Sequence, residues 1–306
     1  MITPKLALVI SLFLVLPVTI CSAQQAADEM KKHEVFLQLD NDVFAFSRFD
    51  RYYTNGIFIG YNYLLNERSR LKFKLSQQIY TPQKYTKPEL KYYDRPYAGV
   101  LYGAGGYQHF IKKAWFEGEL LFGKIGPGSK AEEVQVWYHQ VFGFPEPRGW
   151  RYQIRSGGLI NLKVKSAYNL IAARGFDFWV NGAAAVGNYD RSIQMGPSFR
   201  LGRFLPGEQS YISGSRLGAN GKKEFYLHMG ALFKRVYWNA TLQGVNDHAR
   251  WNMVTMEPER LTNEYFAELV LAYPRFGFSY RIFYRSRETE TASGQYLGSL
   301  RFSYLF

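Results

Sequence analysis

QYLGSLRFSYLF, residues 295–306, closes the chain and alternates between two kinds of side chain. Small, aliphatic and aromatic residues fall on one side, at Tyr296, Gly298, Leu300, Phe302, Tyr304 and Phe306; mostly polar ones fall on the other, at Leu297, Ser299, Arg301, Ser303 and Leu305. Such alternation predicts a β-strand, because successive side chains of a strand point to opposite faces. An apolar face and a terminal phenylalanine are typical of the closing strand of an outer-membrane barrel, since only a closed barrel lets strands cross lipid without unpaired backbone groups.

The other end of the chain has the features of a secretory signal. Lys5 provides a basic start, Leu6 to Ile20 form an apolar stretch, and Cys21 to Ala23 offer small residues for cleavage. We therefore expect a signal peptide over residues 1–23 and a mature chain over residues 24–306. Cys21 is the only cysteine, so this cleavage leaves no disulfide, and the large Ile20 before it argues against lipid attachment.

Composition agrees with a barrel and excludes a bundle of membrane-spanning helices. After the signal, no apolar run approaches the roughly twenty residues that a spanning helix needs. Aromatic residues make up 18% of the chain, including 24 Tyr and 24 Phe, which suits a lipid-facing surface built by alternation. The formal charge of +13 indicates an anionic partner. For an exported chain we expect lipopolysaccharide with its phosphates, and no nucleic acid.

Turn-bounded segments of strand composition number about twelve, and single-chain bacterial barrels have an even number of strands. In order, they are His33–Leu39, Gly56–Leu65, Leu71–Tyr80, Tyr97–Ile111, Ala114–Ile125, Gly157–Leu170, Phe176–Gly187, Ser192–Phe204, Lys223–Trp238, Leu261–Tyr273, Phe276–Arg287 and Gln295–Phe306. We therefore predict an all-β fold, a transmembrane antiparallel β-barrel of about twelve strands with a short helix in an outward loop. No second domain is expected within residues 24–306.

The order of the strands assigns each connection to one of the two ends of the barrel. If both termini are periplasmic, connections after odd-numbered strands face outward and are long, and the others are short turns such as Lys112-Lys113. The segment Leu205 to Lys222 does not fit this rule. Parity assigns it to the periplasmic end, although it is about eighteen residues long.

Three of the outward connections carry reactive or ligand-binding groups. The first holds Asp40 to Asp42 and Asp50 to Gly56, the third holds Thr81-Pro82 and Asp94 to Gly99, and the fifth holds a helical segment with His139, then Gly149-Trp150 and Gln153. Carboxylates, amides, a hydroxyl and an imidazole at one rim are more than a passive pore needs. They suit the hydrolysis of a lipid ester that lies beside the barrel wall.

Together these strings resemble those of the outer-membrane lipid A 3'-O-deacylases. The matching strings are Asn41-Asp42, Tyr-Thr-x-Gly at Tyr53 to Gly56, Asp-Arg-Pro-Tyr-Ala-Gly at Asp94 to Gly99, and Gln135 followed by His139 and Gly149-Trp150-x-x-Gln153. The resemblance runs from about residue 34 to the carboxy terminus. It implies a twelve-stranded barrel with a calcium-dependent active site between the wall and a short helix at the outer rim. It also implies removal of the 3'-linked acyloxyacyl chain of lipid A.

His139 matches the family's catalytic histidine, which implies that it acts as general base. Its segment begins with the capping-box pattern Ser129-Lys130-Ala131-Glu132. An apolar face at helical spacing follows, made by Val134, Trp137, Tyr138 and Val141. A neutral imidazole can take a proton from water as the water attacks an ester. The alternative from the residues alone is a histidine packed at the rim or facing solvent.

Asn41, Asp42 and Thr54 match further site residues of the family. The first two imply oxygen ligands for a calcium ion that polarises the ester carbonyl, with orientation of the histidine as a second role open to Asp42. Thr54 implies contact with the substrate or the oxyanion. By residue type alone, Asn41 and Asp42 also suit a polar turn, and Thr54 suits the start of a strand.

Two basic residues and one acidic residue complete the expected site. Lys87 resembles the family's site lysine and suits a lipid A phosphate or the oxyanion. For Arg95 we expect an ion pair with Asp94 that starts the fourth strand, with substrate contact as the alternative. The family often has an acidic residue soon after Gly-Trp-x-x-Gln, where this chain has Arg155 and Ser156, so Glu146 is a candidate replacement as metal ligand.

The sequence thus favours a calcium-dependent lipid A hydrolase, monomeric and integral to the outer membrane, with its site at the outward rim. Two other functions stay open. A catalytically inactive lipopolysaccharide-binding barrel would keep the basic rim and lose nothing on substitution of His139. A small diffusion pore would need a wide polar lumen, which about twelve strands barely provide.

Overall fold

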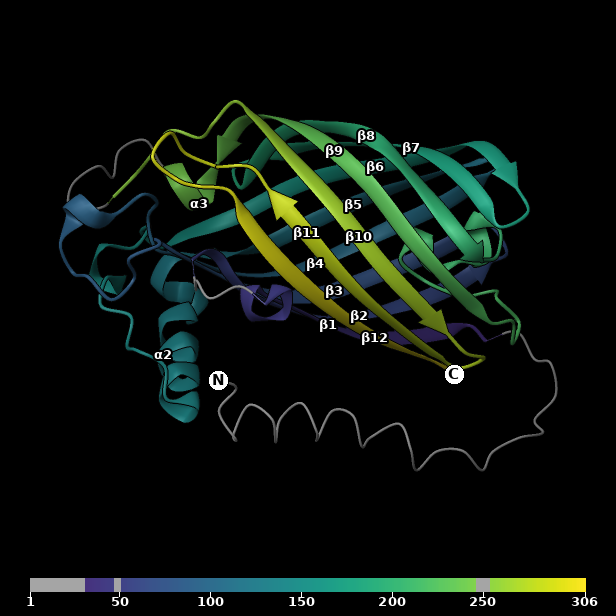
Figure 1. Ribbon diagram of the computed structural model, residues 1–306, viewed down its shortest axis with the longest axis horizontal. Helices are drawn as coiled ribbons and strands as arrows, with labels where there is room; N and C mark the ends of the chain where they lie inside the picture. The colour runs from purple at the N-terminus through teal and green to yellow at the C-terminus, as the bar shows by residue number, and fades with distance from the viewer. Residues whose placement is uncertain (1–30, 47–50, 246–253) are drawn as a thin grey trace.

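Antiparallel strands close into a single barrel in the computed structural model, which describes residues 31–46, 51–245 and 254–306. Each strand pairs with its neighbours in sequence, and β1 closes the barrel against β12 (Figure 1). The strands are β1 (His33–Asn41), β2 (Tyr52–Asn66), β3 (Ser69–Thr81), β4 (Ala98–Ile111), β5 (Ala114–Ile125), β6 (Gly157–Ala173), β7 (Phe176–Gly187), β8 (Asp190–Arg203), β9 (Glu224–Asn239), β10 (Leu261–Ala272), β11 (Phe276–Arg285) and β12 (Gln295–Leu305). The predicted fold class and strand number are confirmed. The predicted signal peptide, residues 1–23, lies outside the described residues.

The alternation that predicted β12 is visible in the burial of its side chains. Tyr296 is 59% exposed on the outer surface, while its neighbour Leu297 is completely buried inside the barrel. Ser299 and Ser303, which share the parity of Leu297, are also buried. Because parity sets the face of a side chain, the same pattern identifies the outward residues of every strand.

The strand boundaries follow the predictions closely. β5 and β7 have the predicted bounds. β2 begins at Tyr52 rather than Gly56, because a bulge at Thr54 allows the ladder with β3 to continue. β1 runs on to Asn41, so this residue belongs to the strand and not to the connection that follows.

Ion pairs occupy the barrel interior. Lys72 of β3 and Lys165 of β6 both contact Glu117 of β5, each at 2.7 Å. Lys74 contacts Glu119 at 2.7 Å one step further along the same strands. Three lysines and two glutamates from three strands thus pair inside the barrel, because an isolated charge away from water is costly.

The connection between β8 and β9, residues 205–222, folds into the barrel end where β1 begins and β12 ends. We call this segment the inner plug, and this end the plug end. It contains the short helices η5 (Gly207–Gln209) and η6 (Tyr211–Ser213). Arg70 of β3 points inward and donates to Ser213 Oγ at 2.9 Å and to the carbonyl oxygens of Ser215 and Leu217 at 3.2 and 2.7 Å. The segment lies at the end where β1 begins and β12 ends, as strand order requires, and its unexpected length is explained by its folding into the barrel.

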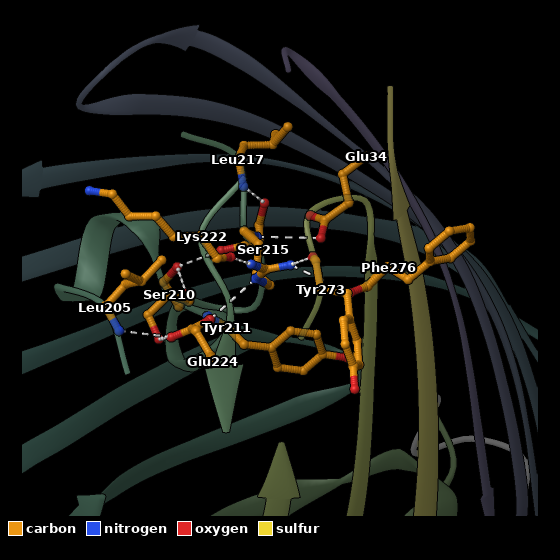
Figure 2. A network of polar contacts seen from close by, with 12 residues as sticks. Glu34, Leu205, Ser210, Tyr211, Ser215, Leu217, Lys222, Glu224, Tyr273 and Phe276 are labelled. Atoms are coloured by element: carbon orange, nitrogen blue, oxygen red, sulfur yellow. Dashed lines mark hydrogen bonds and ion pairs between the residues drawn. The ribbon is translucent and has the colours of Figure 1, made fainter. Parts of the chain in front are cut away.

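A buried ion pair fastens the inner plug to the start of β9. Arg216 is completely buried and lies 3.3 Å from Glu224. Its backbone N–H donates to Glu34 of β1 at 3.3 Å, and its guanidinium also donates to the carbonyl oxygens of Tyr273 and Lys222. Figure 2 shows these acceptors gathered inside the strands. One residue therefore ties the plug to three separate parts of the wall.

The opposite end of the barrel, which we call the loop end, carries the other helices. They are η1 (Asp42–Ala45), η2 (Leu90–Tyr92), η3 (Gly126–Ser129), α2 (Ala131–Phe142), η4 (Trp150–Tyr152) and α3 (Ala240–Gln243), all in connections that follow odd-numbered strands. One such connection is shorter than expected, because only Asn188 and Tyr189 join β7 to β8. Within the described ranges, no helix has the length and apolar character needed to cross a membrane.

Candidate active site

α2 packs on the outer surface of the barrel, next to β3 and β4 (Figure 1). The decisive residue is Gly99 of β4. Its neighbours Ala98 and Val100 are completely buried inside the barrel, so Gly99 faces outward. A Cβ atom at Gly99 would lie 2.2 Å from both Ala131 Cβ and Ser129 Oγ. Helix and wall approach so closely that only glycine fits at this position.

Polar and aromatic contacts hold α2 in place. Trp150 donates its indole N–H to Gln135 Oε1 at 2.9 Å, and Gln153 donates to Glu132 at 3.3 Å. The rings of Trp150 and Tyr97 lie 5.0 Å apart. Burial is the largest cause that raises the pKa of the Glu132 carboxyl above its usual value. The string Gly-Trp-x-x-Gln thus fastens the helix through both of its polar side chains.

The expected capping box at the start of α2 does not form. Lys130 occupies the N-cap position with a left-handed backbone (φ 60°) and makes no side-chain cap. Ser129 ends the preceding turn, where its hydroxyl donates to the carbonyl oxygen of Gly126 at 2.7 Å. Glu132 accepts from Gln153 instead of reaching back to the helix start. Ser129 Oγ still accepts the Ala131 backbone N–H at 3.4 Å, so the serine half of the box is kept and the glutamate half is missing.

The face of α2 that is buried is small and polar. Ala131, Gln135 and His139, each one helical turn apart, are its buried residues. Of the predicted apolar face, Val134 packs against the cluster that contains Tyr97 and Trp150, but Trp137 and Val141 point away from the barrel and are 62% and 40% exposed. On the outer wall of a membrane barrel such side chains can face lipid, so they need no protein partner.

His139 is 3% exposed, and one contact fixes its neutral tautomer. Its Nδ1 lies 2.6 Å from the carbonyl oxygen of Pro145. A carbonyl oxygen only accepts hydrogen bonds, so Nδ1 carries the proton and Nε2 carries the lone pair of the neutral ring. The rings of Tyr85 and Phe144 meet the imidazole edge-on, with centroids at 5.6 and 5.7 Å. The ring is thus oriented, with Nε2 as its basic atom.

A row of paired residues crosses the outer wall at the loop end. Asn41 of β1 pairs with Asn55 of β2, Asn55 pairs with Ile79 of β3, and Ile79 pairs with Gly99 of β4. Asp40, the neighbour of Asn41, faces the interior, so the row has outward parity. We call these four residues the rim row. It leads from Asn41 to the wall beneath the helix that carries His139.

Asn41 and Asp42 are both buried where β1 ends. Asn41 Oδ1 accepts the backbone N–H of Val43 at 2.9 Å and thereby caps η1. Asp42 is 2% exposed, and its Oδ2 accepts the backbone N–H of Arg51 at 3.1 Å. These contacts agree with the turn-forming alternative. The catalytic and metal-binding roles of the two residues stay predictions.

Thr54 is the extra residue of a β-bulge. The pairing of β2 with β3 steps from Tyr53↔Tyr80 to Asn55↔Ile79, which leaves Thr54 without an opposite residue. Its hydroxyl donates to the carbonyl oxygen of Ile79 at 3.2 Å. Bulges re-aim side chains and are common beside active sites. Thr54 therefore lies directly next to the rim row.

The two basic candidates differ sharply in exposure. Lys87 is exposed in the β3–β4 connection, where its backbone N–H donates to Lys84 at 2.9 Å. Arg95 is 1% exposed, pairs with Glu288 at 2.8 Å, and lies 4.5 Å from the centre of the Tyr80 ring. Arg95 thus ties two outward connections together. Contact of either residue with a substrate stays a prediction.

The expected ion pair between Asp94 and Arg95 is wrong. Asp94 accepts the hydroxyl of Tyr52 at 2.8 Å and the backbone N–H of Gln83 at 3.0 Å. Arg95 pairs with Glu288 instead. Both residues lie in a bend ahead of β4, and each side chain contacts a different partner, which separates the two charges.

No metal site is assembled in the part of the chain that the structure describes. It holds no group of three or more His, Cys, Asp or Glu side chains able to bind an ion. Glu146, an expected ligand, is exposed in the connection after α2. Calcium takes about six to eight oxygen ligands. Asn41 and Asp42 supply suitable oxygen types at the rim, but these side chains alone do not complete a calcium site.

Sequence reasoning missed the residues that dock the helix. Gly99, Gln135 and Trp150 were recognised as parts of strings, but their shared structural task was not inferred. The available signal was Gly99 itself, a glycine of outward parity at the start of a strand whose neighbours are apolar.

A family model described as "Outer membrane protein LpxR" matches residues 8–306, nearly the whole chain. The chain belongs to the LpxR family. LpxR proteins are lipid A 3'-O-deacylases of the outer membrane. The resemblance found in the rim strings and the expected outer-membrane location are thus confirmed.

One solved structure shares the fold, and two others are more distant. LpxR from Salmonella typhimurium is 22% identical, covers 89% of this chain and 100% of its own, and superposes with a TM-score of 0.77. The KdgM porin is 5% identical over 89% of this chain and 99% of its own, with a TM-score of 0.43. The translocator domain of the autotransporter NalP from Neisseria meningitidis is 11% identical over 98% and 96%, with a TM-score of 0.44. No curated protein sequence matches this LpxR chain.

Proposed function

We propose that this LpxR chain hydrolyses the ester that links the 3'-acyloxyacyl chain to lipid A, with His139 as general base. Family membership supports the reaction class. The observation that carries the assignment to His139 is its Nδ1 contact with the Pro145 carbonyl, which leaves Nε2 as the basic atom of a buried, oriented imidazole. A base of this kind needs a fixed tautomer before it can accept a proton from water.

In the proposed reaction, His139 Nε2 takes a proton from a water molecule as the water oxygen attacks the ester carbonyl carbon. The tetrahedral intermediate collapses with cleavage of the bond to the sugar oxygen. The proton on Nε2 then passes to that oxygen, so the products are a free fatty acid and a sugar hydroxyl. The Pro145 carbonyl stabilises the doubly protonated ring during this cycle, because it accepts a hydrogen bond from the positive imidazolium.

The neighbouring residues would stabilise the negative charge that develops on the carbonyl oxygen. Thr54 is placed by its bulge beside the rim row, and its hydroxyl can turn from Ile79 toward an oxyanion. Lys87, exposed in the adjacent connection, would attract a lipid A phosphate. Arg95 would support the site indirectly, through the two loops that it joins. Direct contact with the substrate is its alternative role.

Calcium is part of the proposal, with Asp42 and Asn41 as its protein ligands and Glu146 as a further candidate. A bound cation would supply Lewis-acid polarisation of the ester carbonyl. The buried Asp42 carboxylate supports this choice, since hard cations prefer carboxylate and carbonyl oxygens. Because the described side chains make an incomplete site, the proton-transfer steps above are assigned to His139 without reference to the ion.

The position of α2 favours a lipid substrate over a solute in transit. The helix and the rim row lie on the outer wall, where a lipid can reach them from the membrane. The interior is occupied by ion pairs and the inner plug, which argues against a diffusion pore. We further propose that a single chain suffices for activity, since all the residues named belong to one barrel.

The test is mass spectrometry of lipid A incubated with purified protein in detergent and calcium. Wild-type protein should release the 3'-linked acyloxyacyl chain. His139→Ala should slow this release by at least about a hundredfold, the usual worth of a general base. His109→Ala is the matched control, because His109 lies near the far end of β4 and should leave the rate unchanged.

Both variants should show the heat-dependent gel migration of an intact barrel. Wild-type activity in a folded His139→Ala protein would exclude His139 as the base. Lipid A that binds to the wild-type protein but stays uncleaved would identify an inactive lipopolysaccharide-binding barrel.

A further inference from the structure

An apolar groove of about 830 Å³ crosses the outer wall on the side away from α2. Its lining comes from β7 to β12 and contains no charged side chain. The groove lies between two rows of outward residues. The upper row is Tyr296, Tyr284, Tyr265 and Ala231, paired in that order from β12 to β9. The lower row is Gly298, Ile282, Ala267, Met229, Phe199 and Phe178, paired from β12 to β7.

The depth of the groove has a cause in the residues of the wall. Pro197 of β8 belongs to the lining, on a β8–β9 ladder whose register is unchanged from Met195↔Phe233 to Ser198↔Gly230. Proline lacks the N–H that a ladder position needs. Small residues line the wall beside it. Ala231 and Ala267 take places that large side chains hold elsewhere on the outer surface.

Aromatic side chains give the groove a direction. The rings of Tyr296 and Tyr284 lie 5.0 Å apart, and those of Tyr284 and Tyr265 lie 6.4 Å apart. Their hydroxyls are near the loop end, where tyrosines of membrane proteins meet the polar interface. Phe199 and Phe178, at the other end of the groove, carry no polar atom. An occupant is therefore expected to be polar near β12 and purely hydrocarbon near β7.

The lower row continues into the candidate active site. Gly298 pairs with Asn41, so the lower row and the rim row form one line of paired residues around the outer wall. η1 lies on this junction: a Cβ at Gly298 would be 2.5 Å from Phe44, and Tyr280 donates its hydroxyl to the Phe44 carbonyl at 2.5 Å. The lower row, which borders the groove from Ile282 onward, thus begins beside the helix that starts with Asp42.

The lower row also descends into the membrane. Gly298 lies near the loop end of the barrel on β12, whereas Phe178 of β7 lies near the opposite end, which holds the inner plug. Strands of such barrels are tilted, so a line across them runs obliquely down the wall. With strands about 4.8 Å apart, the row from β12 to β7 is about 24 Å long. That length suits an extended hydrocarbon chain.

We propose that this groove binds one acyl chain of the lipid A molecule whose ester is cleaved at the candidate site. The inference rests on the proposed function, and it names a subsite for a chain that stays on the product. The headgroup lies at η1, and one of its retained chains follows the lower row from Ile282 to Phe178. The groove thereby holds the substrate in one register relative to His139.

The experiment fills the groove and measures lipid retention. Ala267→Phe places a ring on the groove floor. Ala184→Phe is the matched control, because Ala184 is an exposed outward alanine on β7 outside the groove. Each change is made in wild-type protein and in the His139→Ala background, and heat-dependent gel migration checks the fold. If Ala267→Phe does not fold, Ala267→Leu replaces it.

Native mass spectrometry then compares lipid A with phosphatidylglycerol as probes. We expect Ala267→Phe to lower the fraction of protein that retains lipid A by at least tenfold, with Ala184→Phe unchanged and little retention of phosphatidylglycerol. Equal retention of lipid A by Ala267→Phe and wild type overturns the subsite. Equal retention of both probes also overturns it, since the groove would then hold any membrane lipid. Retention in the His139→Ala background is measured without turnover, so it does not depend on the proposed activity. If lipid A is retained in the groove but the wild-type protein fails to deacylate it, the proposed function is refuted and the subsite stands.

Discussion

Pro145 determines which nitrogen of His139 can act as a base. A backbone carbonyl cannot donate, so the imidazole must present its proton there, and the opposite nitrogen is left basic. The aromatic rings of Tyr85 and Phe144 restrict rotation of the same imidazole. Orientation therefore comes from Pro145 and Phe144, in the loop after α2, and from Tyr85, in the β3–β4 connection.

Asp42 is the residue at which the calcium proposal can be tested. Asp42→Asn keeps an oxygen that can accept the Arg51 N–H, so the turn should persist. The charge that would attract a cation is lost, and deacylation should fall by about a hundredfold. Release of fatty acid is measured while calcium is varied, with and without chelator, and Glu67→Gln in an exposed turn serves as control. Unchanged activity of Asp42→Asn in chelator would remove the ion from the mechanism.

Candidate site residues could be named from the sequence only where short strings carry them. Asn41, Asp42 and His139 could be named because they stand in recognisable strings. The partner of Arg95 could not, because Glu288 is 193 positions away and the nearer Asp94 looks equally suitable on paper. Residue adjacency gives no information about a contact that the closure of the barrel creates.

At the scale of elements, α2 depends on a wall shaped to receive it. Gly99 allows the start of the helix to touch β4, and Trp150 holds the middle through Gln135. Because the outer face of a strand normally carries large side chains, this contact needs a glycine at one particular place.

We predict that Gly99→Val displaces α2 while the barrel remains closed. The added side chain would overlap Ala131 and Ser129, and neither backbone can yield without moving the helix. Deacylation should fall at least about tenfold, since small misplacements of a catalytic group are costly. Gly103→Val is the control, because no atom lies within 4 Å of a Cβ at Gly103 on the same face of β4. A Gly99→Val protein as active as Gly103→Val would show that the docking of α2 is dispensable.

The strands were the most predictable elements. Alternation survives in every strand because one face meets lipid and the other meets a polar interior, so the twelve segments and most of their ends could be read directly. The bulge at Thr54 could not, because it appears only when two strands are aligned. The docking face of α2 was hidden for a related reason: Trp137 and Val141 face away from the barrel, which reverses the usual rule for soluble proteins.

At the scale of the whole molecule, the inner plug fills one end of the barrel, the end where β1 begins and β12 ends. The inner plug is held by arginines from the wall and from within itself, and Arg70 and Ser213 are 143 positions apart. Sequence parity gave the correct end for this segment. Its inward course depends on partners spread around the whole barrel, which no local pattern reveals.

We predict that Arg70→Ala loosens the inner plug. The guanidinium bonds several plug carbonyls, and their loss leaves buried acceptors unpaired at a cost of roughly 1–3 kcal/mol each. In planar lipid bilayers the wild-type protein should pass little current, whereas Arg70→Ala should show frequent openings. Lys113→Ala, an exposed residue at the same end, is the control. Silent bilayers with folded Arg70→Ala would mean that the interior ion pairs seal the barrel without help from the plug.

The placement of α2 on the outer wall also governs how such a protein meets its substrate. A catalyst whose site opens sideways shares a two-dimensional phase with the lipid it acts on, so encounters depend on lateral diffusion and on the mole fraction of substrate at the surface. Diluting lipid A with inert lipid would slow turnover even at constant total concentration. The lateral mobility and mole fraction of lipids in the leaflet, rather than the concentration of any solute outside it, then limit the rate of the reaction.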